Sequence, residues 1–324
     1  MSELNKNNLP DVDPSLFTFI SNDSIQSEKI IAPRYSYWKS VFRIFFKKKT
    51  NFVLIFLFLF ILFVAYVMPS FWPYDPLENV STATLYNLSP AAAMKRFGGF
   101  SWKYIMGTGT TGNSIMYGIV SSSRTSITLA IICAAINMTV GIIIGAIWGY
   151  SKRFDQFMLV IYNIIANVPY ILLISVLVYI VGAGFWPFVL ALTITGWLGI
   201  AYFFRTQVMI IRDREYSLAS RCLGTPITRI ITKNILPFLV SVIVTLLATE
   251  LPSYINMEVF LSYIGIGLKS DVPSLGRMIQ SAQVAFITYP WEFWPPVAVA
   301  SAITIILYVL GQNLADASDP RTHM

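Results

Sequence analysis

The chain has 324 residues, of which 56% are hydrophobic and only 12% are charged. A soluble domain carries about a quarter charged residues, so this composition excludes an ordinary soluble protein and predicts an integral membrane protein. The net charge of +7 does not call for a nucleic-acid partner, because the positive residues are distributed by membrane side.

The first 72 residues contain three predicted segments. Residues 1–33 are polar and rich in Asn, Ser and Asp, which favours a disordered cytoplasmic segment. Residues 34–49 have apolar side chains at helical spacing and basic ones elsewhere on the helical wheel, which predicts an amphipathic helix at the membrane interface. Residues 52–68 are uninterruptedly apolar and just long enough to span a bilayer. We therefore expect residues 34–72 to form an interfacial helix followed by a leader transmembrane helix.

Residues 73–125 are expected to form an extracellular segment, followed by a core of residues 126–316 and a tail of residues 317–324. Within the core, Gly141, Gly145 and Gly149 recur at four-residue spacing, which makes a small-residue face that permits close helix contact. The fold class is an all-α membrane protein of six spans, one leader plus a five-helix core. The expected core spans are 127–149, 157–181, 185–204, 237–264 and 295–311.

The positive residues indicate which side each loop faces. Of the 23 Lys and Arg residues, 17 fall in the N-terminal segment, in the loops at 151–156 and 205–233, and in the tail. Cytoplasmic loops carry such an excess. We therefore expect a multi-pass protein of the cell membrane with both termini in the cytoplasm.

The residue types give no support for catalysis or cofactor binding. His323 is the only histidine, and Cys133 and Cys222 should lie at different depths, so a His/Cys metal site, a Ser-His-Asp triad and a disulfide are not expected. Residues 107–112 read G-x-G-x-x-G, but no strand precedes them and no acidic residue follows near position 130. A non-enzymatic protein without a cofactor is expected.

A polar stretch at residues 205–237 lies between long apolar segments. Its middle favours a helix, which Gly224 can end in a left-handed conformation. Thr225 and Pro226 then restart a second helix as N-cap and first-turn proline, and Pro237 falls where a third helix would begin. The stretch therefore predicts a helix, a tight corner, a short helix and re-entry into the membrane.

This stretch resembles the cytoplasmic signature loop of ABC importer permeases, which reads Glu-Ala-Ala, three residues, Gly, nine residues and Ile-x-Leu-Pro. Leu218 replaces the Glu, Ser220 the second Ala and Asn234 the Ile. The version EYxLAxRxLG followed by Leu-Pro is similar to the oligopeptide and dipeptide branch of these permeases, and to the C-type subunit of oligopeptide permeases in particular.

Two other stretches carry the same resemblance. Residues 107–127 are similar to the entry of the permease core, with Gly109 in place of the family's Asp and Asn113-Ser114 in place of Arg-Asp. The tail GQNLADASDPR is similar to the usual C-terminal NLxDxxDPR of these proteins. Together the matches cover about two thirds of the chain, residues 105–320.

The resemblance implies a permease subunit that forms half of the translocation pathway of an ATP-driven oligopeptide importer. The implied partners are a homologous second permease, two ATP-binding subunits, an extracellular peptide-binding protein, the lipid bilayer and a peptide substrate. The loop at 205–237 would couple to the ATPases through Glu215, Leu218, Ala219, Ser220, Arg221, Gly224, Thr225, Pro226 and Pro237.

Polar residues inside the spans are candidates for the translocation path, because burying ionisable groups in a membrane is costly. They are Glu250, Asn256, Glu258, Asn163 and Asn167. Glu250 and Glu258 either line a water-filled path or hydrogen-bond across the bundle to Asn163 or Asn167 and fix its packing. Alternatives for the whole chain are an ion-coupled secondary transporter, a membrane scaffold subunit, or a permease for another substrate of the family such as nickel or glutathione.

Overall fold

The computed structural model describes residues 36–76, 78–269 and 271–319. The chain divides into a short N-terminal unit, Met1–Ser40, and a unit of Val41–Met324. All helices belong to the second unit except for the first residues of α1. The segment 1–33, predicted to be disordered, lies outside the described residues.

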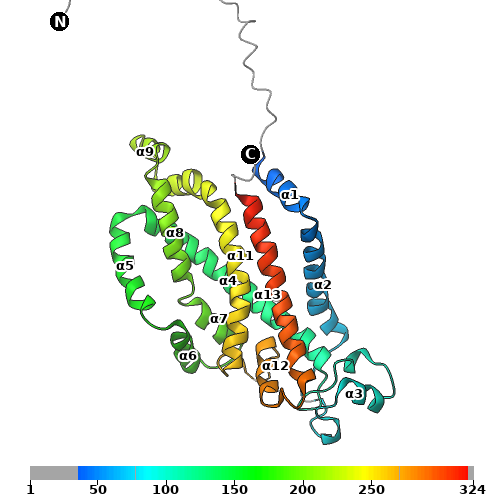
Figure 1. Cartoon of the computed structure of the whole chain (residues 1–324). Coiled ribbons are helices and arrows are strands. Elements are labelled where there is room, and N and C mark those ends of the chain that lie inside the picture. Colours follow the sequence, from blue (N-terminus) through cyan, green and yellow to red (C-terminus); the bar gives the residue numbers. More distant parts are fainter. Residues whose placement is uncertain (1–35, 77, 270, 320–324) are drawn as a thin grey trace, which may run out of the picture. The chain divides into compact units, whose positions relative to one another are not determined.

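The described part of the chain is built from helices joined by turns (Figure 1), and its one β-type pairing is an isolated bridge between Thr108 and Ser114. The all-α fold class is therefore confirmed. The helices are α1 Tyr37–Lys47, α2 Lys49–Phe71, α3 Pro90–Arg96, α4 Ile115–Tyr150, α5 Lys152–Ala166, α6 Tyr170–Val181, α7 Phe185–Thr193, α8 Trp197–Arg212, α9 Glu215–Cys222, α10 Ile227–Arg229, α11 Val240–Tyr263, α12 Leu275–Ala282 and α13 Pro290–Ser318.

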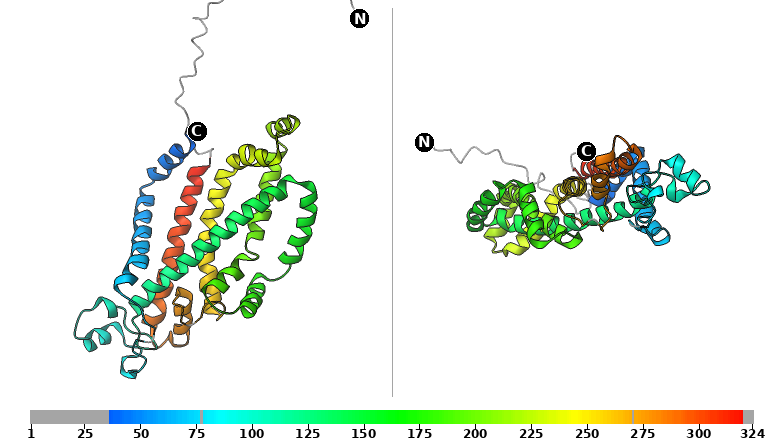
Figure 2. Two further views of the ribbon diagram at one scale, coloured as in Figure 1. Left: turned by 180° about the vertical axis from the view of Figure 1, so that it is seen from behind. Right: turned by 90° about the horizontal axis from the view of Figure 1, so that it is seen from below.

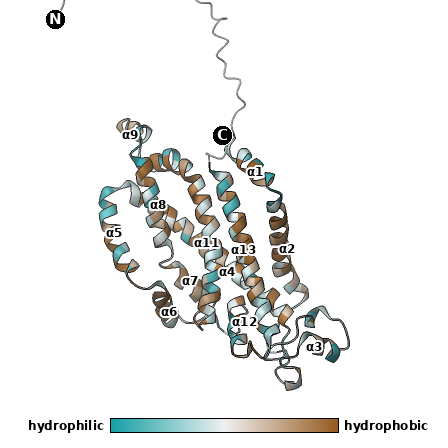
Figure 3. Cartoon of the chain, viewed as in Figure 1, coloured by the Kyte–Doolittle hydropathy of each residue, from teal (hydrophilic) through white to brown (hydrophobic). Residues whose placement is uncertain are grey.

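Five helical stretches of the described chain are long and apolar enough to cross a membrane, and the bent pair α5–α6 makes a sixth if it is counted as one span. The five are α2, α4, α7 with α8, α10 through α11, and α13. In α2 only Asn51 and Ala65 are buried, and Figure 3 shows its strongly apolar surface. Such a helix is the leader span expected from the sequence, packed at one edge of the core.

Hydrogen bonds identify which helix ends lie together. Lys48 at the start of α2 donates to Asn313 Oδ1 near the end of α13 at 2.8 Å, and Ser241 at the start of α11 donates to the Ser318 carbonyl at 2.6 Å. At the other end, the Tyr66 hydroxyl meets Thr128 Oγ1 at 2.7 Å. Within the Val41–Met324 unit, the chain therefore enters α2 and leaves α13 at the same end (Figures 1 and 2).

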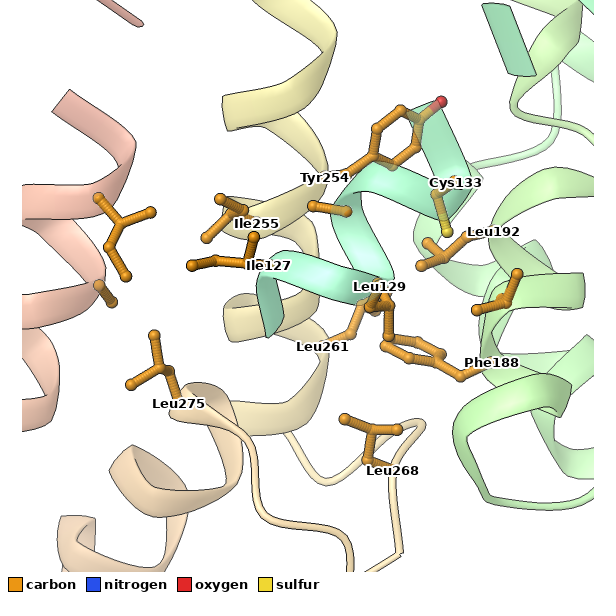
Figure 4. Close-up of a cluster of buried hydrophobic side chains, with 14 of the residues drawn as sticks. Ile127, Leu129, Cys133, Phe188, Leu192, Tyr254, Ile255, Leu261, Leu268 and Leu275 are labelled. Atoms are coloured by element: carbon orange, nitrogen blue, oxygen red, sulfur yellow. The ribbon is translucent and has the colours of Figure 1, made fainter. Parts of the chain in front are cut away.

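The small-residue face of α4 contacts α8. A Cβ added to Gly145 would lie 2.6 Å from the Ala201 carbonyl, and one added to Gly149 would lie 2.6 Å from the Arg205 carbonyl. The glycine spacing thus allows two spans to approach with their backbones nearly touching, as predicted. A separate apolar cluster joins α4 to α7, α11 and α12 around Phe188 and Leu261 (Figure 4).

Helix α4 begins at Ile115, well before the expected start at residue 127. Ser114 caps it by accepting a hydrogen bond from the Tyr117 amide at 3.2 Å. The polar run that follows does not end the helix, because its side chains are hydrogen-bonded. Ser123 donates to the Ile119 carbonyl of the same helix at 2.7 Å, and Ser126 donates to Glu258 on α11 at 2.7 Å. The expected extracellular segment 73–125 therefore ends in three turns of helix.

The span expected at 157–181 is not one straight helix. It divides into α5 and α6, which meet at 84° across a break at residues 167–169. Pro169 is the cause, since proline disfavours a helical conformation in the residue before it and lacks the N–H that would continue the helix. The span expected at 185–204 is also interrupted, between Thr193 and Trp197, and α8 then continues to Arg212.

Two further boundaries differ from the sequence-based prediction. Residues 205–212 belong to α8 rather than to the signature loop. The connection between α11 and α13, which the expected spans 237–264 and 295–311 leave between them, contains α12. Ser274 caps α12 by accepting from the Arg277 amide at 3.2 Å. Helix α13 ends at Ser318, two residues into the expected tail.

Candidate functional site

The expected signature loop forms a helix and a corner beyond the ends of the spans. Figure 1 shows α9 standing off from the bundle, next to the end of α8. After α9, Gly224 has φ +76, the Gly224 amide bonds to the Arg221 carbonyl at 3.0 Å, and the Thr225 amide bonds to the Ser220 carbonyl at 3.1 Å. These two bonds form a Schellman helix end. The left-handed corner expected at Gly224 is confirmed.

The second helix of the loop starts one residue later than predicted. Its N-cap is Pro226, with φ −63 and ψ 145, and not Thr225. Proline lacks a capping side chain, but its fixed φ suits an extended N-cap residue. A π-helical turn, Ile230–Ile235, and a short 3-10 turn, Leu236–Leu239, then lead into α11, with Pro237 in the first positions of the 3-10 turn.

Several contacts hold α9 in place against the chain that follows it. Asn234 Nδ2 donates to Ser220 Oγ at 2.7 Å, and the rings of Tyr216 and Phe238 lie 5.2 Å apart. Ser217 is buried beneath the helix. The helix is therefore attached to the start of α11 as well as to the end of α8.

The outer surface of this loop is exposed. Most of the residues expected to contact an ATPase lie on it: Glu215, Leu218, Ala219, Arg221, Gly224, Pro226 and Pro237 are exposed, and Ser220 and Thr225 are half-buried. Leu223 is 86% exposed and Ile227 is 56% exposed. Large apolar side chains that face water outside the spans are typical of a docking surface.

A buried ion pair lies beneath the loop. Arg205 on α8 donates from Nη2 to Asp155 Oδ2 at 2.9 Å and also binds the other oxygen through Nε. Asp155, at the start of α5, accepts a further bond from Trp148 Nε1 at 2.8 Å. From the sequence, Arg205 and Asp155 were expected in two separate loops, 205–233 and 151–156. Because Asp155 and Arg205 are 50 residues apart in the chain, no local sequence pattern indicated that they form a pair.

The exit of α8 is fixed by a second arginine. Arg212 donates to the Gly149 carbonyl at 2.9 Å and to both carboxylate oxygens of Asp213. Hydrogen bonds from Arg212 lower the pKa of Asp213 below its ordinary value. The junction between α8 and α9 therefore stays ionised at neutral pH and remains tied to the end of α4.

Glu250 lines a cavity of about 510 Å³ between α5, α6, α8 and α11. Asn167, at the break between α5 and α6, lines the same cavity. Its remaining wall is a mixture of aromatic, hydroxyl and aliphatic side chains with the backbone of two glycines: Tyr162, Ile165, Ala166, Val168, Pro169, Tyr170, Leu173, Thr195, Gly196, Leu198, Gly199, Ser253, Tyr254 and Met257. Two of the five candidate path residues are thus brought together.

Glu258 lies elsewhere and is fully buried. Its carboxylate accepts hydrogen bonds from Ser126 at 2.7 Å and from Ser262 at 3.0 Å, and Ser126 Oγ in turn accepts from the Leu275 amide at 3.2 Å. Glu258 therefore joins α4, α11 and α12. Its partners are serines and not the asparagines that the packing alternative proposed.

The other two candidates lie apart from the Glu250 cavity. Asn256 accepts from Thr304 Oγ1 at 3.3 Å and lines a smaller cavity of about 370 Å³ between α11 and α13. Asn163 is exposed on α5, where its carbonyl accepts from Asn167 Nδ2 at 2.5 Å. The structure therefore separates the five residues into one shared cavity and three other places.

Comparisons with known proteins agree with these features. The family described as "Binding-protein-dependent transport system inner membrane component" matches residues 138–324, and the "N-terminal TM domain of oligopeptide transport permease C" matches residues 36–90. The chain is 42% identical to the oligopeptide transport system permease protein AmiD of Streptococcus pneumoniae strain ATCC BAA-255 / R6. The alignment covers 96% of this chain and 99% of AmiD.

Two relatives from Bacillus subtilis strain 168 are more distant. The dipeptide transport system permease protein DppC is 29% identical over 97% of this chain and 94% of its own length. The oligopeptide transport system permease protein OppC is 28% identical over 97% of this chain and 99% of its own length. The chain belongs to the family of binding-protein-dependent transport system inner membrane components, the permease subunits of ABC importers.

Proposed function

We propose that this permease is one of two membrane subunits of an ATP-driven importer of oligopeptides. The printed names of its relatives support the substrate class, and the permease family favours this function over an ion-coupled secondary transporter. A homologous second permease would complete the pathway, and an extracellular peptide-binding protein would deliver the substrate. Permease subunits of this kind are not catalytic, so ATP hydrolysis takes place on separate subunits.

The observation that carries the proposal is the exposed helix α9. It lies beyond the spans, and it presents Leu218 and Leu223 to water next to the Gly224 corner. A pair of ATPase subunits that closes on ATP would push on this surface. Because α9 follows α8 after only two residues and is bonded to the π-helical turn that leads into α11, a push on α9 would move both spans.

The ion pair below α9 extends this coupling to α5. Arg205 and Asp155 join α8 to the first turn of α5, while Asn167, just beyond the end of α5, and Thr195, just before α8, line the Glu250 cavity. A displacement at α9 would therefore change the walls of that cavity. We propose that Glu250 and Asn167 line part of the peptide path, where the Glu250 carboxylate would accept hydrogen bonds from peptide N–H groups.

The proposed orientation places α9 in the cytoplasm. The excess of Lys and Arg in the loops at 151–156 and 205–233 supports it. The starts of α2 and α11 and the end of α13 share one end of the helices, as an even number of crossings requires. With that end in the cytoplasm, α3 and α12 face the outside.

Transport in proteoliposomes tests the function. The permease is reconstituted with its second permease, the ATPases and the binding protein, and uptake of a labelled peptide is measured. We expect uptake to require ATP on the side of the membrane where the ATPases are bound, and to continue when a protonophore is present. Uptake driven by a proton gradient without ATP would instead support a secondary transporter.

Cysteine labelling tests the docking surface directly. The chain has two cysteines, of which Cys133 is buried and Cys222 on α9 is exposed. A membrane-impermeant maleimide should label Cys222 in inside-out vesicles and not from the outside, and Cys133 serves as the unreactive internal control. Adding cysteine-free ATPase subunits should slow the labelling of Cys222. Labelling from outside contradicts the orientation, and an unchanged rate with ATPases contradicts the contact.

A further inference from the structure

A further cavity is lined by residues of α12 and the first turn of α13. Figure 1 shows α12 at the end of the bundle opposite α9. The cavity has a volume of about 340 Å³ and lies between the segment after α2, the residues around α12 and the first turn of α13. Its lining includes Gly109, Thr110, Thr111 and Asn113, which belong to the G-x-G-x-x-G stretch and its flank. Neither the coupling surface nor the Glu250 cavity uses this stretch.

One lining residue is a buried acid. Glu292, in the first turn of α13, is only 5% exposed, and its Oε1 has no hydrogen-bond partner among the described residues. A buried carboxylate that lacks a partner is strongly destabilised as an anion. An ionised Glu292 therefore requires a cation or a hydrogen-bond donor in the cavity.

The charged neighbours in the lining do not supply that group. Arg277 on α12 is the positive residue of the lining, and its guanidinium bonds to Gln280 Oε1 one turn along its own helix. Asp271 adds a second carboxylate to the wall. The bond to the neutral Gln280 leaves the charge of Arg277 in place. Two ionised acids against one guanidinium give the lining a net charge of −1, which favours a positively charged occupant.

Two other polar side chains of the wall are hydrogen-bonded to the protein. Thr111 Oγ1 donates to the Pro76 carbonyl at 2.8 Å, and Asn113 Nδ2 donates to the Tyr74 hydroxyl at 2.6 Å. Gly109 packs tightly against Asn113, since a Cβ there would lie 2.6 Å from Asn113 Oδ1. Among the described lining residues, Glu292 alone keeps a buried polar atom without a partner.

We propose that this cavity is a cation socket that binds an ammonium or guanidinium group at the outer face of the permease, with Glu292 as the receiving anion. Its volume suits the end of one basic side chain or one amino-terminal residue. Two sources have this chemistry: a Lys or Arg of the extracellular binding protein, and the amino group of the arriving peptide. The sidedness and the two sources rest on the proposed function, while the charge preference of the cavity does not.

The test uses the complete importer in nanodiscs, with Glu292→Gln as the probe variant. Gln has nearly the same shape as Glu, but it removes the charge and replaces one accepting oxygen with an NH2 group that donates. Glu78→Gln is the matched control, because Glu78 is an acid in the segment after α2 that is paired with Lys103 and does not line the cavity. Arg277→Gln is a second variant with the opposite sign, since it removes the positive group of the lining.

Two measurements distinguish the sources. The first is the Kd of the peptide-loaded binding protein for the importer at low and high salt. The second is the KM for uptake of a peptide without Lys or Arg, with a free or an acetylated amino terminus. Glu292→Gln should raise one of these constants about tenfold, equivalent to about 1.4 kcal/mol, and Arg277→Gln should lower the same constant. Glu78→Gln should leave both within about twofold, the scale of an exposed pair.

A change in the first measurement assigns the socket to the binding protein, and a change in the second that disappears on acetylation assigns it to the peptide. If Glu292→Gln leaves both constants unchanged in a correctly assembled complex, Glu292 is a neutral acid and the proposal is wrong. If the Glu292→Gln importer does not assemble, Arg277→Gln is the deciding variant. An unchanged Kd and an unchanged KM in that variant would show that the cavity is not a cation socket. ATP-dependent uptake by the unmodified importer is measured in the same preparation, so failure of the transport function is recognised separately.

Discussion

Asn234 donates a hydrogen bond from Nδ2 to Ser220 Oγ over 2.7 Å, and these residues occupy two of the three positions at which the loop departs from the generic permease pattern. The generic pattern has an alanine and an isoleucine at these positions. The two departures therefore form one polar contact in place of one apolar contact. Ser220 Oγ also donates to the Tyr216 carbonyl at 2.9 Å, which ties this contact to the first turn of α9.

The Ser220–Asn234 pair should behave as a unit. Ser220→Ala or Asn234→Ile alone leaves a half-buried polar group without its partner, at a cost of about 1 kcal/mol. We expect each single variant to lower peptide uptake per ATP hydrolysed by roughly fivefold, and the double variant to recover most of it because both polar groups are gone. Uptake and ATP hydrolysis are measured together in proteoliposomes. Losses that simply add in the double variant would show that the two residues act independently.

Gly224 should tolerate only residues that accept a positive φ. Its φ of +76 costs other residues about 1–2 kcal/mol, although a Cβ would meet open space there. Gly224→Leu should therefore insert normally and lose ATP-driven uptake, because the corner deforms or the added side chain projects into the ATPase contact. Gly224→Asn, which adopts this conformation more readily, is the control and should keep most activity. Normal uptake by Gly224→Leu at normal expression contradicts the docking assignment.

Removing Asp155 should destabilise the fold. Asp155→Ala leaves Arg205 largely buried without its counter-charge, which costs about 3 kcal/mol, and we expect a melting temperature lower by several degrees in detergent. Asp213→Ala is the comparison variant, since the Asp213 side chain is 64% exposed and Arg212 keeps its bond to the Gly149 carbonyl. A pair with one solvent-exposed partner should contribute about 0–1 kcal/mol. Equal melting temperatures for the two variants would show that the Arg205–Asp155 pair contributes little.

Glu250 and Glu258 should respond differently to the same substitution. Glu250→Gln changes a cavity wall, so the uptake rate should change while thermal stability and complex yield stay within error. Glu258→Gln replaces an oxygen that accepts from a serine with an NH2 group that cannot accept, so stability should fall by about 1–3 kcal/mol. Uptake and melting temperature are measured for both. A Glu250→Gln variant that is normal in rate and stability has neither a path role nor a packing role.

The sequence by itself determined the membrane class, the all-α fold and the Gly224 corner. These features follow from local properties: apolar runs of spanning length, the φ freedom of glycine, and the four-residue glycine spacing on α4 that meets α8. The residues of the loop also carried the resemblance to ABC importer permeases that the family comparison bears out. Such signals survive without knowledge of the neighbouring helices, because each lies within a few turns of chain.

Only the tertiary structure decided which polar residues meet. Asp155 and Arg205 lie 50 positions apart, and Ser126 and Glu258 lie 132 apart, and no local periodicity encodes such separations. The start of α4 at Ile115 and the continuation of α8 through Arg205 also depended on partners elsewhere in the bundle, because a polar side chain stays in a helix when another helix supplies its hydrogen bond or counter-charge. For the same reason the five polar candidates in the spans could be named from the sequence, but not where each lies: Glu250 and Asn167 share one cavity, and Glu258, Asn256 and Asn163 lie in three other places.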